Sequence, residues 1–169
     1  MSSTATLAIG PTICVADYRD PRDAAAVVAL LDAYARDPMG GGAALAKAVK
    51  ARLVGDLAAN PHAFSLIARL DDAPVGLANC FMGYSTFAAA PLVNIHDFAV
   101  VPSHRGAGIG RALLLAVEAE ALKRGAIKVT LEVLSGNDPA KRLYAANGYG
   151  DYQLDPASGH ALFWQKRLT

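Results

Sequence analysis

The sequence predicts a single α/β domain, residues 1–169, built on a mixed central sheet of about seven strands with about four helices. Strand-like and helix-like hydrophobic patterns alternate along the chain, and no segment repeats. The length of 169 residues suits one domain, and 53% of the residues are hydrophobic against 18% charged. This composition is typical of a compact protein with a normal core rather than of a disordered chain.

Turn and cap residues divide the first half of the chain into elements. Asp20-Pro21 is typical of a helix start, because Asp20 can cap free N–H groups and proline suits the first helical turn. Asp71-Asp72-Ala73-Pro74 is typical of a turn between antiparallel strands. These signals predict a strand at 12–16, helices at 20–36 and 43–59, and strands at 63–70, 75–84 and 92–101.

The second half alternates helices and strands. An apolar stripe at helical spacing, from Ile109 to Val117, predicts a helix that Gly125 closes. Asp138-Pro139 begins another helix. We expect a helix at 109–124, a strand at 127–134, a helix at 138–148, and two final strands at 149–154 and 161–167 around a turn at 155–159.

Net charge and cysteine use argue against several function classes. The 16 basic and 15 acidic residues give a formal charge of +1, so no basic excess favours nucleic acid or a membrane surface. No stretch approaches the ~18 apolar residues of a membrane span, and we expect a cytoplasmic protein. Cys14 and Cys80 lie far apart and in no metal-ligand spacing, so we expect two reduced thiols and no metal.

A glycine-rich loop between a strand and a helix predicts a phosphate site. Gly106, Gly108 and Gly110 alternate where the helix begins, and the first helical turn offers free N–H groups and a positive dipole end. Arg105 adds a fork of donors for a phosphate oxygen. A tight turn without a ligand is the alternative. A P-loop fits badly because no Lys follows the glycines, and a Rossmann fingerprint fits badly because the spacing differs.

Polar residues in the strand before this loop predict a reacting centre. Asn94, His96 and Asp97 lie in a strand that should be mostly buried, where unpartnered polar groups are costly. In a regular strand His96 and Asp97 point to opposite faces, so one of them at most faces a given pocket unless a bulge intervenes. Either could take a proton from an attacking amine, directly or through water. A structural carboxylate and an ordinary histidine are the alternatives.

The loop and its surroundings resemble the GNAT (Gcn5-related N-acetyltransferase) superfamily. Arg105-x-x-Gly108-x-Gly110, after a strand ending in Val-x-Pro, is similar to its acyl-CoA loop, and the element order matches its fold along nearly the whole chain. The resemblance implies splayed central strands and acetyl-CoA as co-substrate, with no metal. It implies these CoA contacts: Arg105, Gly106, Gly108, Gly110 and Arg111 for the pyrophosphate, and Phe98, Ala99 and Val100 for the pantetheine arm and the thioester carbonyl.

Residues 130–149 resemble the closing block of the same family. Asn137 and Tyr144 are seven residues apart, which on a helix places them on one face ~10 Å apart. The resemblance implies that Asn137 bonds the CoA arm and that Tyr144 protonates the leaving thiolate or donates a hydrogen bond to it. Without the resemblance, Tyr144 would be interpreted as a core aromatic residue.

The resemblance also implies an acceptor pocket at the first two helices, the end of the third strand and the last hairpin. The candidates there are Tyr34, Tyr84, Ser85, Phe87, Glu132, Tyr152 and His160. Residues 84–87 resemble the diamine acetyltransferase-like branch, which has an acidic pair where this chain has His96-Asp97. Because one carboxylate is missing, a small primary amine is a better expectation than a polycation.

Together these features predict an acetyl-CoA-dependent N-acetyltransferase that acts on a primary amine of a small molecule, by direct attack in a ternary complex. A protein or peptide N-acetyltransferase and a non-catalytic acyl-CoA-binding module are the alternatives. The resemblance leaves a homodimer open. A lysine-like amine with a pKa near 10.4 is about 0.04% neutral at pH 7, so the enzyme must offset about 4.6 kcal/mol.

Overall fold

The computed structural model describes residues 10–152, 155, 157, 159 and 161–168, and the chain divides into two compact units. The first unit, Met1–Leu131, holds a five-stranded sheet and the helices α1 (Pro21–Arg36), α2 (Lys47–Ala59) and α3 (Ile109–Lys123). The second, Glu132–Thr169, holds α4 (Asp138–Ala146). The α/β class and the four helices are confirmed, whereas the expectation of about seven strands is wrong: the described residues form five.

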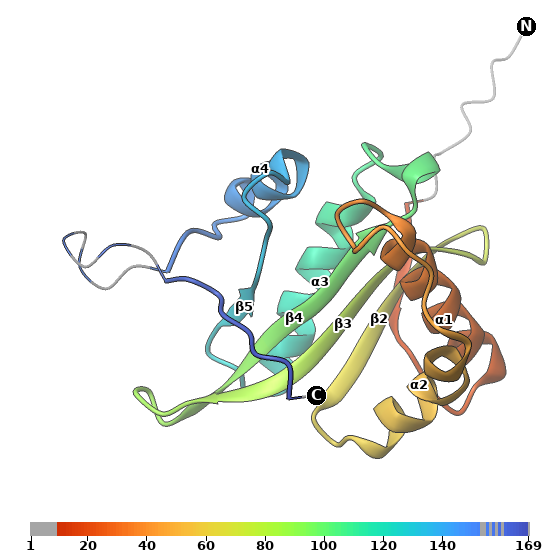
Figure 1. The fold of residues 1–169 in the computed structure, drawn as a ribbon, viewed down its shortest axis with the longest axis horizontal. Helices are drawn as coiled ribbons and strands as arrows, with labels where there is room; N and C mark the ends of the chain where they lie inside the picture. Colours follow the sequence, from red (N-terminus) through yellow and green to blue (C-terminus); the bar gives the residue numbers. More distant parts are fainter. Residues whose placement is uncertain (1–9, 153–154, 156, 158, 160, 169) are drawn as a thin grey trace, which may run out of the picture. The chain divides into compact units, whose positions relative to one another are not determined.

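The sheet follows the order of the chain, β1-β2-β3-β4-β5 (Figure 1). Its strands are β1 (Thr12–Val15), β2 (Ala63–Leu70), β3 (Ala73–Ser85), β4 (Ala90–Val100) and β5 (Val129–Leu131). The first four pair antiparallel, and β5 pairs parallel to β4. A parallel neighbour needs a long crossover, which the short 3-10 turn η1 (Pro102–His104) and α3 supply.

The turn between β2 and β3 is a two-residue hairpin turn. Asp71 and Asp72 both have positive φ, 46° and 65°, as a type I′ turn requires, and aspartate tolerates this region better than most residues. The predicted turn is confirmed, and it is tighter than expected. Because it uses two residues only, pairing continues up to Leu70 opposite Ala73.

Helices cover both faces of the sheet. On one face, Ile67 of β2 and Leu77 of β3 are buried with Val27 and Leu30 of α1. The neighbouring pair, Ala68 opposite Gly76, points to the other face, where α3 begins. A side chain on Gly76 would lie 3.3 Å from Ala68 and 3.6 Å from Ile109 of α3, so glycine lets this helix approach the sheet closely.

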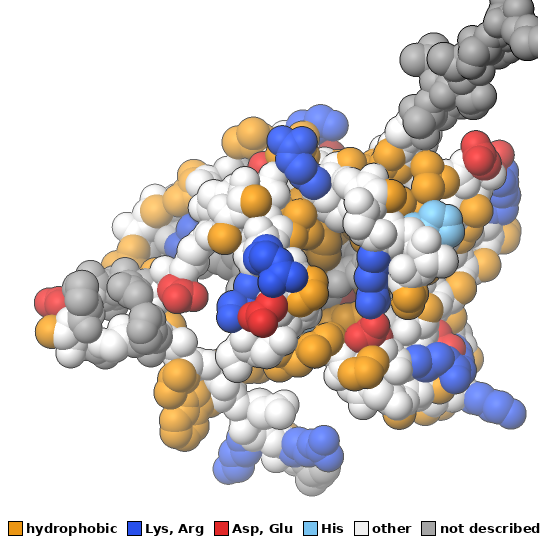
Figure 2. Space-filling model, turned by 90° about the horizontal axis from the view of Figure 1, so that it is seen from above, with side chains coloured by type: hydrophobic (Ala, Val, Ile, Leu, Met, Phe, Trp, Pro, Cys, Tyr) orange, Lys and Arg blue, Asp and Glu red, His pale blue; other side chains and the backbone are white. Residues whose placement is uncertain are grey.

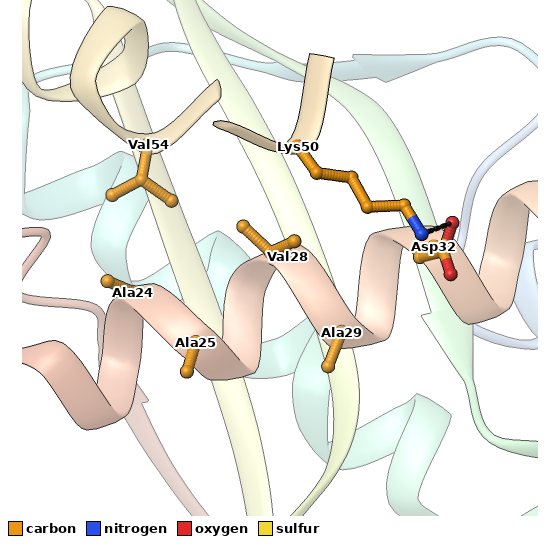
Figure 3. Close-up of a pocket in the computed structure, with 7 residues that line it drawn as sticks. All are labelled: Ala24, Ala25, Val28, Ala29, Asp32, Lys50 and Val54. Carbon is orange, nitrogen blue, oxygen red and sulfur yellow. Dashed lines mark ion pairs between the residues drawn. The ribbon is translucent and has the colours of Figure 1, made fainter. Parts of the chain in front are cut away.

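The N-terminus of α1 forms as its cap residues predict, and α2 begins later than predicted. Asp20 accepts a hydrogen bond from the Arg22 N–H at 2.7 Å, with proline in the first turn. Residues 43–46 remain outside α2, because the carboxylate of Asp32 accepts the Leu45 N–H at 2.8 Å. The same carboxylate pairs with Lys50 at 2.8 Å, across a groove that small apolar side chains of α1 line (Figure 3).

The two final strands are not formed in the described residues. Tyr149–Tyr152 and Ala161–Arg167 have no strand structure, and Gln153 and Leu154 lie outside the described residues. Phe163 and Trp164 are 78% and 83% exposed, so neither side chain is buried against a neighbour. A strand is stabilised by pairing and by one buried face, and neither is present here. The predicted strand at 127–134 is likewise shortened to Val129–Leu131.

Candidate active site

A β-bulge lies at the predicted reacting centre of β4. Asn79 of β3 stands opposite Asp97, and Cys80 stands opposite Ile95, so His96 is an extra residue with no partner position. The strand is also less buried than expected, since His96 is exposed and Asp97 is half-buried. An extra residue shifts the alternation of side chains along a strand.

The bulge brings His96 and Asp97 to one face of β3. The imidazole of His96 packs edge-on against Phe81, with the ring centroids 5.7 Å apart. The carboxylate of Asp97 accepts a hydrogen bond from the amide Nδ2 of Asn79 at 3.0 Å. Phe81 and Asn79 are two residues apart on one strand and so point to the same side. Both predicted candidates therefore contact this face, as the bulge allows.

Asn79 and Ser65 are functional candidates that sequence reasoning missed. Ser65 Oγ donates to Asn79 Oδ1 at 2.6 Å, and it lies 2.8 Å from the Tyr18 hydroxyl. Ser65 is 0% and Asn79 3% exposed, and they are the buried polar side chains of the part of the chain that the structure describes. The available signal was a polar residue with apolar residues on both sides in each strand, Phe64-Ser65-Leu66 and Ala78-Asn79-Cys80.

Tyr34 of α1, an acceptor candidate, lies within the electrostatic reach of Asp97. Burial raises the pKa of Tyr34, and the charges of Asp97 and Asp37 raise it further. Its hydroxyl donates to the Met39 carbonyl at a long 3.5 Å. Tyr34 therefore presents a neutral phenol beside a carboxylate at neutral pH.

The other acceptor candidates of the first unit lie apart from Asp97. Tyr84 is 61% exposed and stands opposite Pro91, five residues along β3 from Asn79, which is about 17 Å of strand. Ser85 accepts the Ala88 N–H in the turn between β3 and β4, where Phe87 is fully exposed. Tyr34 thus lies within the electrostatic reach of Asp97, whereas Tyr84 lies farther along β3.

The glycine loop has the shape that a phosphate group needs. Gly106 and Gly108 have φ of 80° and 79°, and a side chain on either would meet no atom within 4 Å. Gly108 caps α3, whose first helical bond runs from the Ala112 N–H to the Gly108 carbonyl at 3.0 Å. The N–H groups of residues 109–111, with Gly110 and Arg111 among them, precede that bond at the positive end of the helix. These residues fit the pyrophosphate of CoA.

Arg105 is held between the loop and α1. Its Nε donates to the Val100 carbonyl at 2.9 Å, and its terminal nitrogen pairs with Asp37 at 2.8 Å. This guanidinium is the main cause that lowers the pKa of Asp37. Its expected contact with the pyrophosphate stays a prediction, and it requires the guanidinium to leave or share Asp37.

Pairing between β4 and β5 is short. It covers Val93–Ile95 of β4, and the Asn94 amide donates to Thr130 Oγ1 at 3.2 Å. Phe98, Ala99 and Val100 lie in the part of β4 beyond this paired segment. This is the arrangement that the predicted splay requires, and the binding of the pantetheine arm at these residues stays a prediction.

The remaining candidates belong to the second unit. Asn137 caps α4, because its Oδ1 accepts the Ala140 N–H at 3.3 Å, so it lies just before the helix rather than within it. Tyr144 is 7% exposed, with its ring 6.0 Å from that of Tyr149. Glu132 and Tyr152 are exposed, and His160 lies outside the described residues. The roles expected of these residues stay predictions.

Charge is dispersed over the surface. Figure 2 shows Lys and Arg side chains in several separate groups, some with an acidic side chain beside them. The described residues contain no group of three or more His, Cys, Asp or Glu that could hold a metal ion. None of the described helices is long and apolar enough to cross a membrane.

Proteins similar to this chain are acetyltransferases. A streptothricin acetyltransferase of Streptomyces lavendulae is 42% identical over 65 residues, 38% of this chain and 34% of that enzyme, so the chain spans about a third of its length. An uncharacterized N-acetyltransferase of Bacillus subtilis (strain 168), YhfO, is 32% identical over 133 residues, 75% of this chain and 83% of that protein.

Solved structures show the same fold. An aminoglycoside acetyltransferase from an uncultured soil metagenomic sample, crystallised in complex with sisomicin, superposes with a TM-score of 0.72 at 18% identity, over 92% of this chain and 97% of that one. The sequence model of the acetyltransferase (GNAT) family matches residues 27–149, from α1 to the end of the predicted closing block. This protein is therefore a member of the GNAT acetyltransferase family.

Proposed function

We propose that this N-acetyltransferase transfers the acetyl group of acetyl-CoA to a primary amine of a small molecule. The observation that carries the proposal is the Asp97 carboxylate, held on the β4 bulge by Asn79. Tyr34 lies within its electrostatic reach, since burial and then the charge of Asp97 raise the pKa of that phenol. A carboxylate there attracts a cationic amine and accepts its proton. The Tyr34 phenol would be a polar side chain facing the same amine.

The donor would bind along the start of α3. The glycine backbone at Gly106 and Gly108 leaves room for the pyrophosphate, and the N–H groups of the first turn bond its oxygens. Backbone groups of Phe98, Ala99 and Val100 would bond the pantetheine arm, and one of their N–H groups would polarise the thioester carbonyl.

The reaction would be a direct transfer. The amine nitrogen attacks the thioester carbonyl carbon, an N–C bond forms, and the C–S bond breaks. Asp97 takes the proton of the amine, directly or through water, and the departing thiolate receives a proton from Tyr144. His96 sits beside Asp97 but is exposed, so we assign the base to Asp97.

The acceptor would be a small molecule that carries a primary amine. The names of similar proteins point to streptothricin and aminoglycosides as their acceptors, and both classes are small molecules. This chain offers one carboxylate where the diamine acetyltransferase-like pattern has two. An acceptor that presents one amine to the site matches the one carboxylate, Asp97, and the one phenol, Tyr34, that we propose there.

A thiol-release assay with acetyl-CoA tests the proposal over a panel of aminoglycosides, diamines, amino acids and peptides. We expect CoA release with at least one small amine, and Asp97→Asn should lower kcat/KM by about 10²–10⁴-fold while CoA affinity in calorimetry stays unchanged. Tight CoA binding with no release on any amine would instead identify an acyl-CoA-binding module. Release on peptides alone would identify a protein N-acetyltransferase.

A further inference from the structure

We infer that Tyr18, Ser65 and Asn79 act as a positioning relay that aims the Asp97 carboxylate at the acceptor amine. The inference rests on the proposed role of Asp97 as base. The relay runs across four neighbouring strands. Tyr18 follows β1, Ser65 lies on β2, Asn79 lies on β3, and the carboxylate lies on β4.

The hydrogen bonds of the relay have one direction. Ser65 has a single hydroxyl proton, which it donates to Asn79 Oδ1 at 2.6 Å. The Tyr18 hydroxyl, 2.8 Å away, must therefore donate to Ser65 Oγ. Since its carbonyl oxygen is engaged by Ser65, Asn79 turns its Nδ2 to Asp97, 3.0 Å away. Tyr18 thus fixes, through two bonds, the orientation of the amide that holds the carboxylate.

The burial of the relay argues for a function beyond packing. Ser65 is 0% and Asn79 3% exposed, among apolar neighbours such as Leu66 and Ala78. Apolar residues of similar size would fill these positions without the cost of burying polar groups. A buried polar network whose groups are all hydrogen-bonded fixes the orientation of its side chains. This network ends on Asp97, a residue of the candidate site.

The donor at the end of the relay suits a base. Asn79 is neutral, so it orients the carboxylate without cancelling its charge as an arginine or lysine would. The charge of Asp97 acts on its surroundings, because it helps to raise the pKa of Tyr34 on α1 and of Cys80 on β3. The carboxylate is therefore oriented by a neutral donor.

Kinetics of Asn79→Leu, Ser65→Ala and Tyr18→Phe test the relay. We expect kcat to fall about 10- to 100-fold, about 10-fold and about 3-fold respectively, because misplacing a reacting group is costly, while the KM for acetyl-CoA stays unchanged. Val27→Ala, a buried change on α1 outside the relay, should lower the melting temperature and leave kcat unchanged.

A double-mutant cycle separates positioning from general damage. In the Asp97→Asn background, Ser65→Ala and Tyr18→Phe should cost nothing further, because the group that they aim is absent. Full additivity in that cycle would overturn the relay, even if each single change lowers kcat.

NMR chemical shifts of the Asn79 side chain test the relay without a measurement of catalysis. The side-chain amide protons of Asn79 should lie downfield in the wild type, and Ser65→Ala, Tyr18→Phe and Asp97→Asn should each move them upfield. If the Asn79 amide signals do not shift in Ser65→Ala and Tyr18→Phe, the relay is refuted, whatever the activity of these variants. If the signals move but the wild type acetylates no amine, the relay stands as geometry and the proposed function alone fails.

Discussion

At the scale of single residues, the extra residue in β4 determines which side chains lie together at the candidate site. Because His96 is the extra residue, Asp97 stands opposite Asn79 and accepts a hydrogen bond from its side-chain amide. The imidazole of His96 packs against Phe81 rather than on the α3 side of the sheet. A regular strand would send one of the two side chains to the opposite face. The bulge thus places a carboxylate and an imidazole side by side.

Tyr144 supplies the first prediction at this scale. Tyr144→Phe should lower kcat by about 10²–10⁴-fold in the thiol-release assay, because the leaving thiolate loses its proton donor, and CoA affinity should change little. Tyr149→Phe is the matched control, since the Tyr149 ring lies 6.0 Å from that of Tyr144 and the change removes the same atom. Unchanged turnover of Tyr144→Phe would exclude the acid role.

Local residue patterns predicted some of these positions and missed others for a physical reason. Asp20 and Gly108 act on their own neighbours in sequence, so their cap roles can be predicted from local patterns. Ser65 and Asn79 act on partners 14 and 18 residues away, across strands whose register depends on the bulge. No local pattern specifies such a register.

At the scale of elements, the connection between α1 and α2 sets the position of Tyr34. Gly40 packs so tightly against the end of α1 that a Cβ would lie 2.0 Å from the Tyr34 carbonyl oxygen and 3.0 Å from its ring. Asp37 and Arg105 tie the same connection to the glycine loop. Acceptor and donor elements are therefore linked within the first unit.

Gly40→Ala should displace this connection. We expect a loss of about 1–3 kcal/mol in the free energy of unfolding, because the methyl group overlaps backbone atoms, together with a higher KM for the amine. Denaturant unfolding and steady-state kinetics measure the two effects. Equal stability and KM for variant and wild type would show that this contact does not position Tyr34.

Gly55→Ala is a matched glycine substitution that should raise the free energy of unfolding rather than lower it. Gly55 is exposed within α2, and a side chain there would meet no atom within 4 Å. Alanine should raise the free energy of unfolding by about 0.5–1 kcal/mol through its better helix propensity, with kinetics unchanged. A destabilised Gly55→Ala would show that the helix ends before this residue in solution.

Element prediction was accurate where a cap or a tight turn flanked the element, and it failed for the two final strands. The range of α1 and of β2 follows from flanking signals such as Asp20 and the Asp71-Asp72 turn. The two final strands were predicted around a turn at 155–159, but a turn signal does not supply the packing against neighbouring strands on which a strand depends. The described residues of both segments have no strand structure, and Trp164 is 83% exposed.

At the scale of the whole molecule, the carboxylate of Asp32 connects two helices and contributes to the response to acid. Asp32 pairs with Lys50 of α2, and it accepts the Leu45 N–H in the segment between α1 and α2. These bonds lower the pKa of Asp32 to about 2, and the bond from Lys50 is the largest cause. Its pKa in the folded chain thus lies below the ordinary value of 3.8. The stabilisation is complete above pH 3.8 and is lost as the pH falls towards 2.

Thermal unfolding between pH 2 and pH 7 checks this linkage. Asp32→Asn should melt below the wild type at pH 5–7, and the gap should shrink as the pH falls from about 4 to 2. Lys50→Met should lose most of the same pH dependence, because it removes the largest cause. A gap that stays constant down to pH 2 would show that another carboxyl group controls the acid response.

The strand order of the sheet has a consequence for how the chain acquires it. Spatial order equals chain order in the described sheet, so no strand has to enter between two that already pair. Each new strand adds to the edge that its predecessor formed, and β5 closes the series after α3 has crossed over. The sheet can therefore grow in one direction as the chain leaves the ribosome, from β1 and β2 outward.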